Sequence, residues 1–210
     1  MERAKQVAKI LLRIKAVKLS INPSFTYSSG IKSPIYCDNR LIPSYPEERE
    51  KIISAWEEVI KENNIEFDVI AGTATAGIPW ASFLAYKLNK PMVYVRSKPK
   101  GHGAGKQVEG TMHSGSRVLI VEDLISTGGS SLSSAQACQR EHQAEIVGVL
   151  AIFNYQLKKS VQQFKENNIS LFALSNFSTL VDVATENNFL PPEDKANVLA
   201  WNHDPHNWGQ

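Results

Sequence analysis

The feature of this sequence that most constrains its fold is an alternation of strand-like and helix-like segments between residues 67 and 186. Short apolar runs bounded by turn residues predict strands, and they lie at residues 67–72, 91–96, 117–123, 145–153 and 170–175. Helices are predicted between and after them, at residues 78–88, 131–142, 158–166 and 180–186. Such alternation predicts an α/β fold with a doubly wound, mostly parallel sheet flanked by helices.

A helix, an irregular segment and a second helix are predicted before the alternating part. Five aliphatic residues recur at helical spacing and predict an amphipathic N-terminal helix: Val7, Ile10, Leu11, Ile14 and Val17. Residues 23–46 are punctuated by proline and glycine around a short extended piece at residues 35–38. Ser44, with Glu47 three residues later, has the spacing of a capping box and predicts a helix through about Lys61.

Composition limits the class of partner. The chain has 210 residues, 42% of them hydrophobic, which is enough to bury a core without disulfides or metals. Its 23 basic and 21 acidic residues give a net charge of +2, too mild to indicate nucleic acid or a membrane surface as a partner. Cys37 and Cys138 lie in no redox motif, and neither a secretory leader nor a membrane-length apolar run occurs. We therefore expect a cytoplasmic protein.

The stretch "VLIVEDLISTGGSS" at residues 118–131 ends an aliphatic strand in two carboxylates, Glu122 and Asp123. Because open α/β sheets bind their ligands at the carboxyl ends of the strands, both side chains are expected at a ligand site. The following loop is rich in donors and flexible at its glycine pair, and a helix is predicted to begin near Ser130 or Ser131. Backbone N–H groups in such a turn, with the positive end of the helix dipole, favour a bound phosphate. Neither the P-loop motif nor the dinucleotide G-x-G-x-x-G motif is present.

A phosphorylated ribose explains why carboxylates lie so near an anion site. Glu122 and Asp123 would accept hydrogen bonds from vicinal ribose hydroxyls, while "STGGS" holds the 5′-phosphate. The alternative is a helix cap preceded by a surface acidic pair. The direct continuation of the pair from a buried strand favours the ribose site.

The turn "GTATAG" at residues 72–77 is a second candidate anion site. It follows a predicted strand, and its small residues let backbone amides approach a ligand. An ordinary tight connection between a strand and a helix would have the same composition.

A group of cations and donors lies at the start of the long polar segment at residues 98–115. Arg96 suits bidentate phosphate contact, Lys98 and Lys100 supply point charges, and His102 can donate a proton or a hydrogen bond. Together they would clamp a pyrophosphate. A glycine-rich stretch this long inside a compact domain is usually functional or disordered, and a solvated basic loop is the alternative.

These motifs resemble those of one enzyme family. The stretch at residues 118–131 looks like the phosphoribosyl pyrophosphate motif of type I phosphoribosyltransferases. Four other segments resemble the orotate phosphoribosyltransferases in order and spacing: "FTYSSGIKSPIYCDNR", "AGTATAGIP", "YVRSKPKGHGAG" and "EGTMHSG". The resemblance covers roughly residues 20–155. It implies transfer of the 5-phosphoribosyl group from phosphoribosyl pyrophosphate to orotate, with Mg²⁺, to give orotidine 5′-phosphate and pyrophosphate in pyrimidine biosynthesis.

The resemblance also implies roles for individual residues. Catalytic roles fall to Arg96, Lys100, His102 and Asp123. Phosphoribosyl pyrophosphate is expected to contact Thr73, Ala74, Arg96, Lys98, Lys100, His102, Glu122, Asp123, Leu124, Ile125, Ser126, Thr127, Gly128, Gly129 and Ser130. Orotate is expected to contact Ser28, Ser29, Gly30, Lys32 and Ser126. Mg²⁺ is expected to be carried mainly by the substrate phosphates, so no residue is assigned as a metal ligand.

The expected base site lacks two positive charges that part of the family carries. Some orotate enzymes carry a lysine where this chain has Ser28 and an arginine where it has Tyr155. Lys32 is the nearest cation in the sequence, and a surface lysine is the alternative interpretation.

The whole chain, residues 1–210, is expected to form one phosphoribosyltransferase domain. Residues 1–45 would supply the N-terminal helix and a base-binding hood, residues 46–190 the α/β core and residues 191–210 a C-terminal tail. The resemblance implies a homodimer in which residues 98–115 complete the neighbour's site, with no nucleic acid or membrane partner.

Other functions fit the sequence less well. A regulator that binds phosphoribosyl pyrophosphate and nucleic acid would need a large basic face, which a net charge of +2 does not indicate. A purine phosphoribosyltransferase fits "FTYSSGIKSPIYCDN" and "KPKGHGAG" less well, and a generic nucleotide-binding module would need the P-loop lysine. His203 and His206 in "WNHDPHNW" could suggest a metal site, but we expect a loose aromatic tail there.

Overall fold

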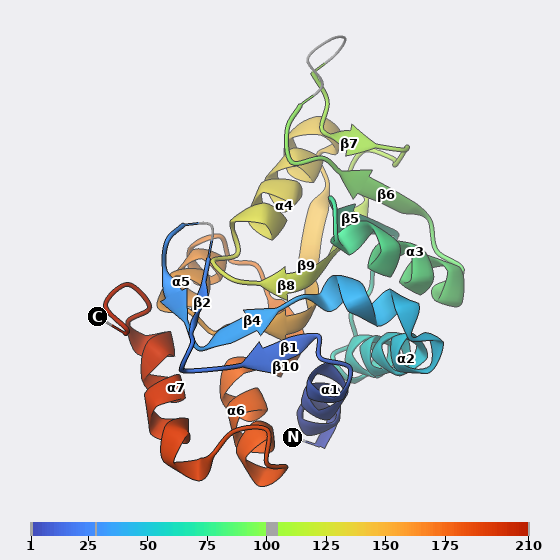
Figure 1. Cartoon of the computed structure of the whole chain (residues 1–210). Coiled ribbons are helices and arrows are strands. Elements are labelled where there is room, and N and C mark those ends of the chain that lie inside the picture. The colour runs from blue at the N-terminus through green and yellow to red at the C-terminus, as the bar shows by residue number, and fades with distance from the viewer. Residues whose placement is uncertain (1, 28, 100–104, 210) are drawn as a thin grey trace.

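The computed structural model describes residues 2–27, 29–99 and 105–209, and its centre is a six-stranded sheet (Figure 1). The strand order is β10-β9-β8-β5-β6-β7. All neighbours pair in parallel except β7, which pairs antiparallel with β6 at one edge. The strands are β5 (Val69–Thr73), β6 (Met92–Val95), β7 (Val108–Glu109), β8 (Arg117–Ile125), β9 (Glu145–Asn154) and β10 (Leu171–Asn176). The predicted mostly parallel sheet is confirmed.

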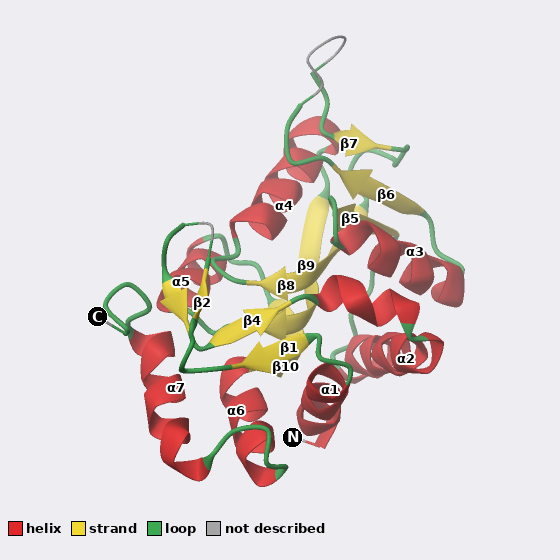
Figure 2. Cartoon of the chain, in the orientation of Figure 1, coloured by secondary structure: helices red, strands yellow, loops and turns green. Residues whose placement is uncertain are grey.

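Helices cover both faces of the sheet, as Figure 2 shows. One face carries α1 (Glu2–Arg13), α2 (Pro46–Glu62), α3 (Gly77–Leu88) and α6 (Phe177–Glu186), with α7 (Lys195–His203) packed on α6. The other face carries α4 (Gly129–His142) and α5 (Lys158–Glu166). Consecutive aliphatic residues of β8 alternate between the two cores, because successive side chains of a strand point to opposite faces. The run of residues 118–121 is continuous and apolar for this reason.

The N-terminal part adds two small sheets beside the main one. β1 (Val17–Leu19) pairs antiparallel with β4 (Ile35–Cys37), and β2 (Phe25–Thr26) pairs antiparallel with β3 (Lys32–Ser33). A 3-10 helix, η1 (Asn39–Ser44), leads from β4 toward α2. We call residues 25–33 the base hairpin, because they contain most of the residues expected to contact orotate.

Two predictions of helix bounds are wrong in detail. The second helix does not begin with a capping box: α2 starts at Pro46, Tyr45 is its N-cap without a side-chain bond, and Ser44 ends η1. Proline suits the first helical position because its fixed φ matches the helix and its missing N–H would have no partner there. The first helix ends at Arg13, and Val17 belongs to β1.

The C-terminal part is also more ordered than predicted. Residues 192–194 form a short 3-10 helix, η2 (Pro192–Asp194), and α7 follows it. Trp201 in α7 is 1% exposed and Trp208 packs partly buried against the same core, so the two tryptophans of the segment predicted as a loose aromatic tail are held in place.

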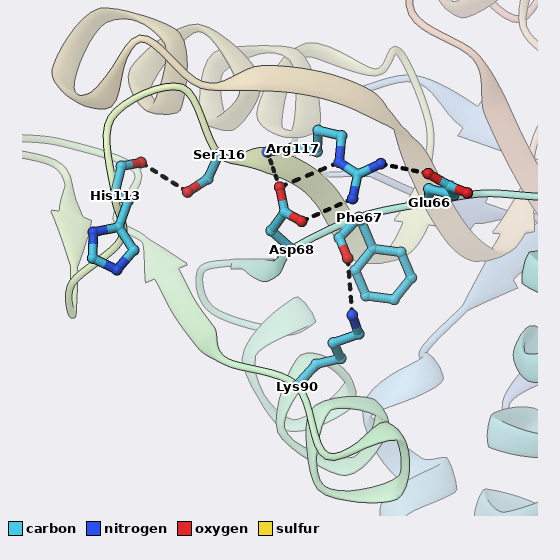
Figure 3. A network of polar contacts seen from close by, with 7 residues as sticks. All are labelled: Glu66, Phe67, Asp68, Lys90, His113, Ser116 and Arg117. Atoms are coloured by element: carbon cyan, nitrogen blue, oxygen red, sulfur yellow. Dashed lines mark hydrogen bonds and ion pairs between the residues drawn. The ribbon is translucent and has the colours of Figure 1, made fainter.

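A polar network ties the chain together at the amino ends of β5 and β8 (Figure 3). The Arg117 guanidinium donates to Asp68 through Nη2 at 2.9 Å and to Glu66 through Nη1 at 2.7 Å. The hydrogen bonds that the Arg117 side chain and backbone N–H donate to Asp68 lower the pKa of Asp68 to about 2. Lys90 Nζ donates to the Phe67 carbonyl at 3.1 Å, which joins the segment before β6 to the same network. The network therefore fixes the amino ends of the strands. The candidate site lies at the opposite, carboxyl ends.

Candidate active site

The candidate site lies where β5 and β8 end side by side. The two strands are parallel neighbours, with Gly72 paired opposite Val121. Thr73 and Glu122 follow these residues at the same edge of the sheet. The structure therefore brings together two predicted parts of the site, the turn after β5 and the acidic pair of β8.

A close backbone approach holds the turn after β5 against β8. A Cβ atom at Gly77, the first residue of α3, would lie 2.4 Å from the Val121 carbonyl oxygen. Only glycine fits at this distance, so α3 can start directly beside the end of β8. The Ala74–Thr75 peptide bond in this turn is cis.

Thr73 presents a buried hydroxyl at this edge. The residue is 3% exposed, and its Oγ1 atom has no hydrogen-bond partner in the described part of the chain. A buried hydroxyl without a partner is unfavourable, so a ligand oxygen bound at this position would remove the penalty. This is the physical support for placing a substrate at the turn.

Glu122 is buried at the carboxyl end of β8. Its side chain accepts a hydrogen bond from Ser130 Oγ at 2.8 Å and one from the Asp123 backbone N–H at 3.2 Å, and the residue is 5% exposed. Burial, together with the negative charge of Asp123, raises the pKa of Glu122 from 4.5 to about 8. The burial excludes the alternative of a surface acidic pair.

Asp123 is half-buried and is held by a residue that the sequence analysis missed. Asn39, fully buried at the start of η1, donates from Nδ2 to the Asp123 carbonyl oxygen at 2.7 Å. Burial raises the pKa of the Asp123 carboxyl, and hydrogen bonds with the Glu122 side chain and the backbone, followed by the positive charge of Arg40, oppose this rise. Arg40 itself donates to both carboxylate oxygens of Asp38, at 2.6 and 2.8 Å. The polar run "CDNR" was the available signal, but nothing in it indicates contact with β8.

The loop after β8 is open and rich in donors. Ser126 and Thr127 are exposed, and α4 begins at Gly129 without a side-chain cap. The helix starts one or two residues earlier than predicted. Gly128 has φ +86°, and a Cβ there would lie 2.8 Å from the Phe164 ring, so only glycine fits. The uncapped N–H groups of the first turn therefore remain available to an anion.

Two residues of the predicted phosphate run belong to the strand. Leu124 and Ile125 continue β8, and Ile125 is buried in the core. They can offer a ligand backbone groups only where the strand ladder leaves these free.

Two of the predicted cations, Arg96 and Lys98, lie at the edge formed by β6 and β7. Arg96 follows β6 and makes an ion pair with Glu109 of β7, Nη1 to Oε1 at 3.3 Å. Lys98 is exposed, and Lys100 and His102 lie outside the described residues. The polar segment is not irregular throughout, because its residues 108–109 form β7.

The part of this polar segment that leads into β7 is hydrogen-bonded to α4. Glu141, in the last turn of α4, accepts hydrogen bonds from the backbone N–H groups of Gln107 at 2.9 Å and Val108 at 3.1 Å. The helix that starts at the open loop thus also anchors the segment that carries the predicted pyrophosphate cations.

The residues predicted to contact orotate lie on two elements. Ser29 and Gly30 are exposed in the turn of the base hairpin, and Lys32 is exposed in β3, while Ser126 lies on the loop after β8. Lys32 also lines a cavity of about 420 Å³ with Trp208 and other residues of the hairpin and C-terminal segment. Ser28 lies outside the described residues.

Comparison with known proteins supports one family. The sequence model for the phosphoribosyl transferase domain matches residues 44–183. An orotate phosphoribosyltransferase from Coxiella burnetii is 50% identical over 208 residues, which cover 99% of each chain. One from Enterococcus faecalis is 50% identical over 207 residues, 99% of this chain and 98% of the relative. The chain belongs to the orotate phosphoribosyltransferase family.

A solved member of this family has the same fold. The crystal structure of orotate phosphoribosyltransferase from Aeropyrum pernix matches with a TM-score of 0.74 and 28% identity, over 84% of this chain and 96% of that one. Within the described residues of the present family member, no cluster of three or more His, Cys, Asp or Glu side chains could hold a metal ion. The described helices include none that is both long and apolar enough to cross a membrane.

The raised pKa of Glu122 predicts how the stability of the ligand-free protein depends on pH. A carboxyl whose pKa is about 8 when folded and near 4.5 when unfolded binds its proton more tightly in the folded state. Stability therefore falls as pH rises through this window, by on the order of a few kcal/mol. Glu122→Gln removes this loss, so its Tm should exceed that of the wild type at pH 9 and differ little from it at pH 5.

The control is Glu193→Gln, which changes an exposed residue of η2. Differential scanning calorimetry of the three proteins at both pH values measures the effect. An equal Tm difference between Glu122→Gln and the wild type at pH 5 and pH 9 would contradict the account.

Proposed function

We propose that the protein transfers the 5-phosphoribosyl group from phosphoribosyl pyrophosphate to orotate, giving orotidine 5′-phosphate and pyrophosphate in pyrimidine (UMP) biosynthesis. The observation that carries this proposal is the buried acidic pair of β8, which is followed by an open, donor-rich loop at the start of α4. A ribose 5-phosphate matches both parts, because it has hydroxyls at one end and a phosphate at the other. The 50% identity to named orotate enzymes supports the choice of acceptor.

The chemistry requires preorganised charge more than a nucleophilic side chain. N1 of orotate forms a bond to C1 of the ribose, the bond from C1 to the pyrophosphate oxygen breaks, and the N1 proton passes to water or to the leaving group. Positive charge develops on the sugar and negative charge on pyrophosphate. Arg96 and Lys98, with Lys100 and His102, would stabilise the leaving group. The Thr73 hydroxyl would donate to it from the turn after β5.

We infer that Glu122 and Asp123 accept hydrogen bonds from the ribose hydroxyls. The 5′-phosphate would bind residues 126–130, where Ser126, Thr127, Gly129 and Ser130 are exposed. We call residues 126–130 the phosphate loop. Ser130 of this loop also donates a hydrogen bond to the Glu122 carboxyl, which links the two parts of the site.

We also propose that Mg²⁺ enters with phosphoribosyl pyrophosphate. Mg²⁺ usually keeps several waters and binds through substrate phosphates with one or two carboxylates. This mode of metal binding fits Glu122 and Asp123, which are two adjacent carboxylates. The described residues contain no larger acidic cluster that would hold the metal by itself. When bound, the metal would neutralise charge on the pyrophosphate.

For orotate we propose the base hairpin residues Ser28, Ser29, Gly30 and Lys32, with Ser126 from the phosphate loop. The hairpin turn offers exposed amides and hydroxyls, which suit a polar ring with a carboxylate. Lys32 would supply the cation.

We further propose a cytoplasmic homodimer of single-domain subunits, in which residues 98–115 complete the site of the neighbour. The support is the position of the described ends of this segment, residues 98–99 and 105–109, at the sheet edge formed by β6 and β7, where Glu141 anchors the backbone of Gln107 and Val108 (Figure 1). Residues 1–45 would form the hood, residues 46–190 the core and residues 191–210 the C-terminal part of the same domain.

The activity assay separates the proposed function from a purine phosphoribosyltransferase. Purified protein with phosphoribosyl pyrophosphate and Mg²⁺ should consume orotate, seen as loss of orotate absorbance, and should release pyrophosphate. Hypoxanthine and adenine should give no product, because the base hairpin is expected to select a carboxylate-bearing pyrimidine. Turnover with either purine and none with orotate would refute the proposal. Binding of phosphoribosyl pyrophosphate without any turnover would instead favour a regulator.

The homodimer proposal predicts complementation between two inactive chains. Lys100→Ala and Asp123→Asn subunits should each be nearly inactive, because one lacks a pyrophosphate cation and the other a ribose carboxylate. After subunit exchange, half the dimers are mixed, and one site in each has both groups intact. Activity should recover to roughly a quarter of the wild-type value if the sites act independently.

Subunit exchange is verified with differently tagged chains. Lack of recovery in a mixture that has demonstrably exchanged would show that residues 98–115 serve their own subunit.

A further inference from the structure

The C-terminal helix α7 reaches the base hairpin through one fully buried tryptophan. Trp201 is 1% exposed, and its indole Nε1–H donates to the backbone carbonyl oxygen of Lys32 at 3.0 Å. Lys32 lies in β3, one of the two strands of the hairpin. A side chain from the last helix therefore fixes the backbone of a segment near the start of the chain.

Aromatic contacts extend this link into the core. The Trp201 ring meets Tyr27 of the hairpin nearly edge to face, with centroids 6.3 Å apart. It also contacts Tyr155 at 5.7 Å and Phe177 of α6 at 5.5 Å. Edge-to-face and tilted pairs of this kind are favourable arrangements of aromatic rings. Trp201 thus touches both the hairpin and the core.

Tyr155 connects the same cluster to the phosphate loop. It follows β9, and its backbone N–H donates to the Ile125 carbonyl at 2.9 Å, next to Ser126. Asn202 of α7 donates from its side chain to the Tyr155 carbonyl oxygen. Adjacent residues of α7 therefore contact the hairpin directly, through Trp201, and the loop after β8 indirectly, through Tyr155.

The Tyr155 side chain is committed to this packing. It is 4% exposed, and its hydroxyl accepts from the Tyr27 hydroxyl at 3.3 Å. Burial raises the pKa of Tyr155 well above its usual range, so the phenol stays neutral. The position where some related enzymes carry an arginine is occupied here by a structural ring.

The base hairpin needs such support because it is short. β2 and β3 contain two residues each, and isolated two-stranded hairpins are marginally stable in water. Ser33 gives local help, since its Oγ donates to the Ile35 carbonyl at 2.9 Å, but this bond lies at the base of the hairpin. The Lys32 carbonyl depends on Trp201.

We propose that α7 is part of the orotate site and that Trp201 is a positioning residue, whose indole N–H holds the Lys32 carbonyl and thereby sets the base hairpin against the phosphate loop. This inference rests on the proposed function, because it assumes that the hairpin contacts orotate. It assigns to the C-terminal helix a role in binding the acceptor and none in binding phosphoribosyl pyrophosphate.

The test compares two tryptophans that differ in what their N–H groups hold. Trp201→Phe keeps an aromatic ring and removes the donor to Lys32. The matched control is Trp56→Phe, because Trp56 is also fully buried and donates from Nε1 to a backbone carbonyl, that of Ala151 at 3.4 Å in the sheet. Steady-state kinetics give the KM for each substrate, and calorimetry gives the Tm of each variant.

Trp201→Phe should raise the KM for orotate about 10-fold, the scale expected when a buried carbonyl loses its donor, and leave the KM for phosphoribosyl pyrophosphate nearly unchanged. Trp56→Phe should lower the Tm without a selective change in the KM for orotate. Unchanged orotate KM in folded Trp201→Phe would overturn the inference, and so would an equal rise in Trp56→Phe. Absence of orotate turnover in the wild type would instead overturn the proposed function.

Hydrogen–deuterium exchange supplies a readout that does not depend on activity. Peptides from residues 25–33 should exchange faster in Trp201→Phe than in the wild type or Trp56→Phe. Should Trp201→Phe fail to fold, Asn202→Leu removes the donor to Tyr155 from a half-buried position and should raise the KM for orotate selectively. Wild-type exchange of the hairpin in Trp201→Phe, or an unchanged orotate KM in Asn202→Leu, would contradict the proposal.

Discussion

The candidate site is built around a glutamate that is buried beside an aspartate at the end of β8, which is an electrostatically unfavourable position for a carboxylate. Glu122 is 5% exposed, and its pKa is raised to about 8 by burial and by the neighbouring charge. A buried carboxyl is tolerated when donors surround it, and Ser130 and the Asp123 N–H serve here. Such a group is poised to accept hydrogen bonds from a ligand, and perturbed carboxyls of this kind are concentrated at functional sites.

The rest of the molecule places groups around this pair from distant parts of the chain. Gly77 allows the turn with Thr73 to lie against β8, and Asn39 fixes the Asp123 backbone from the N-terminal part. The first residue of α4 follows the loop after β8. The last turn of α4 anchors the polar segment, because Glu141 accepts a hydrogen bond from the Gln107 backbone N–H. The site is thus assembled mainly by close backbone contacts and buried hydrogen bonds at the edge of a rigid sheet.

Local sequence signals were sufficient for the sheet and for the position of the loop between β8 and α4. Continuous aliphatic runs ended by turn residues identified β8 and β9, and α5 has the predicted bounds, residues 158–166. The features that the sequence did not predict depend on contacts between residues far apart in the chain. The two-residue strand β7 exists because it pairs with β6, and the burial of Trp201 requires Tyr27 and Tyr155 as neighbours. Asn39 was missed for the same reason, since an amide that bonds a distant carbonyl has no periodicity.

The central claim is that the buried acidic pair holds the ribose, and binding of phosphoribosyl pyrophosphate tests it most directly. Isothermal titration calorimetry should compare Glu122→Gln/Asp123→Asn with Glu193→Gln/Asp194→Asn, which makes the same change in a solvent-accessible Glu-Asp pair of η2. The β8 double variant should bind at least about 10-fold more weakly, because the loss of even one bond to a charged acceptor, here Asp123, costs roughly 1.5–3 kcal/mol. The η2 variant should bind as the wild type does. Equal affinity in all three proteins, with the β8 variant folded, would contradict the account.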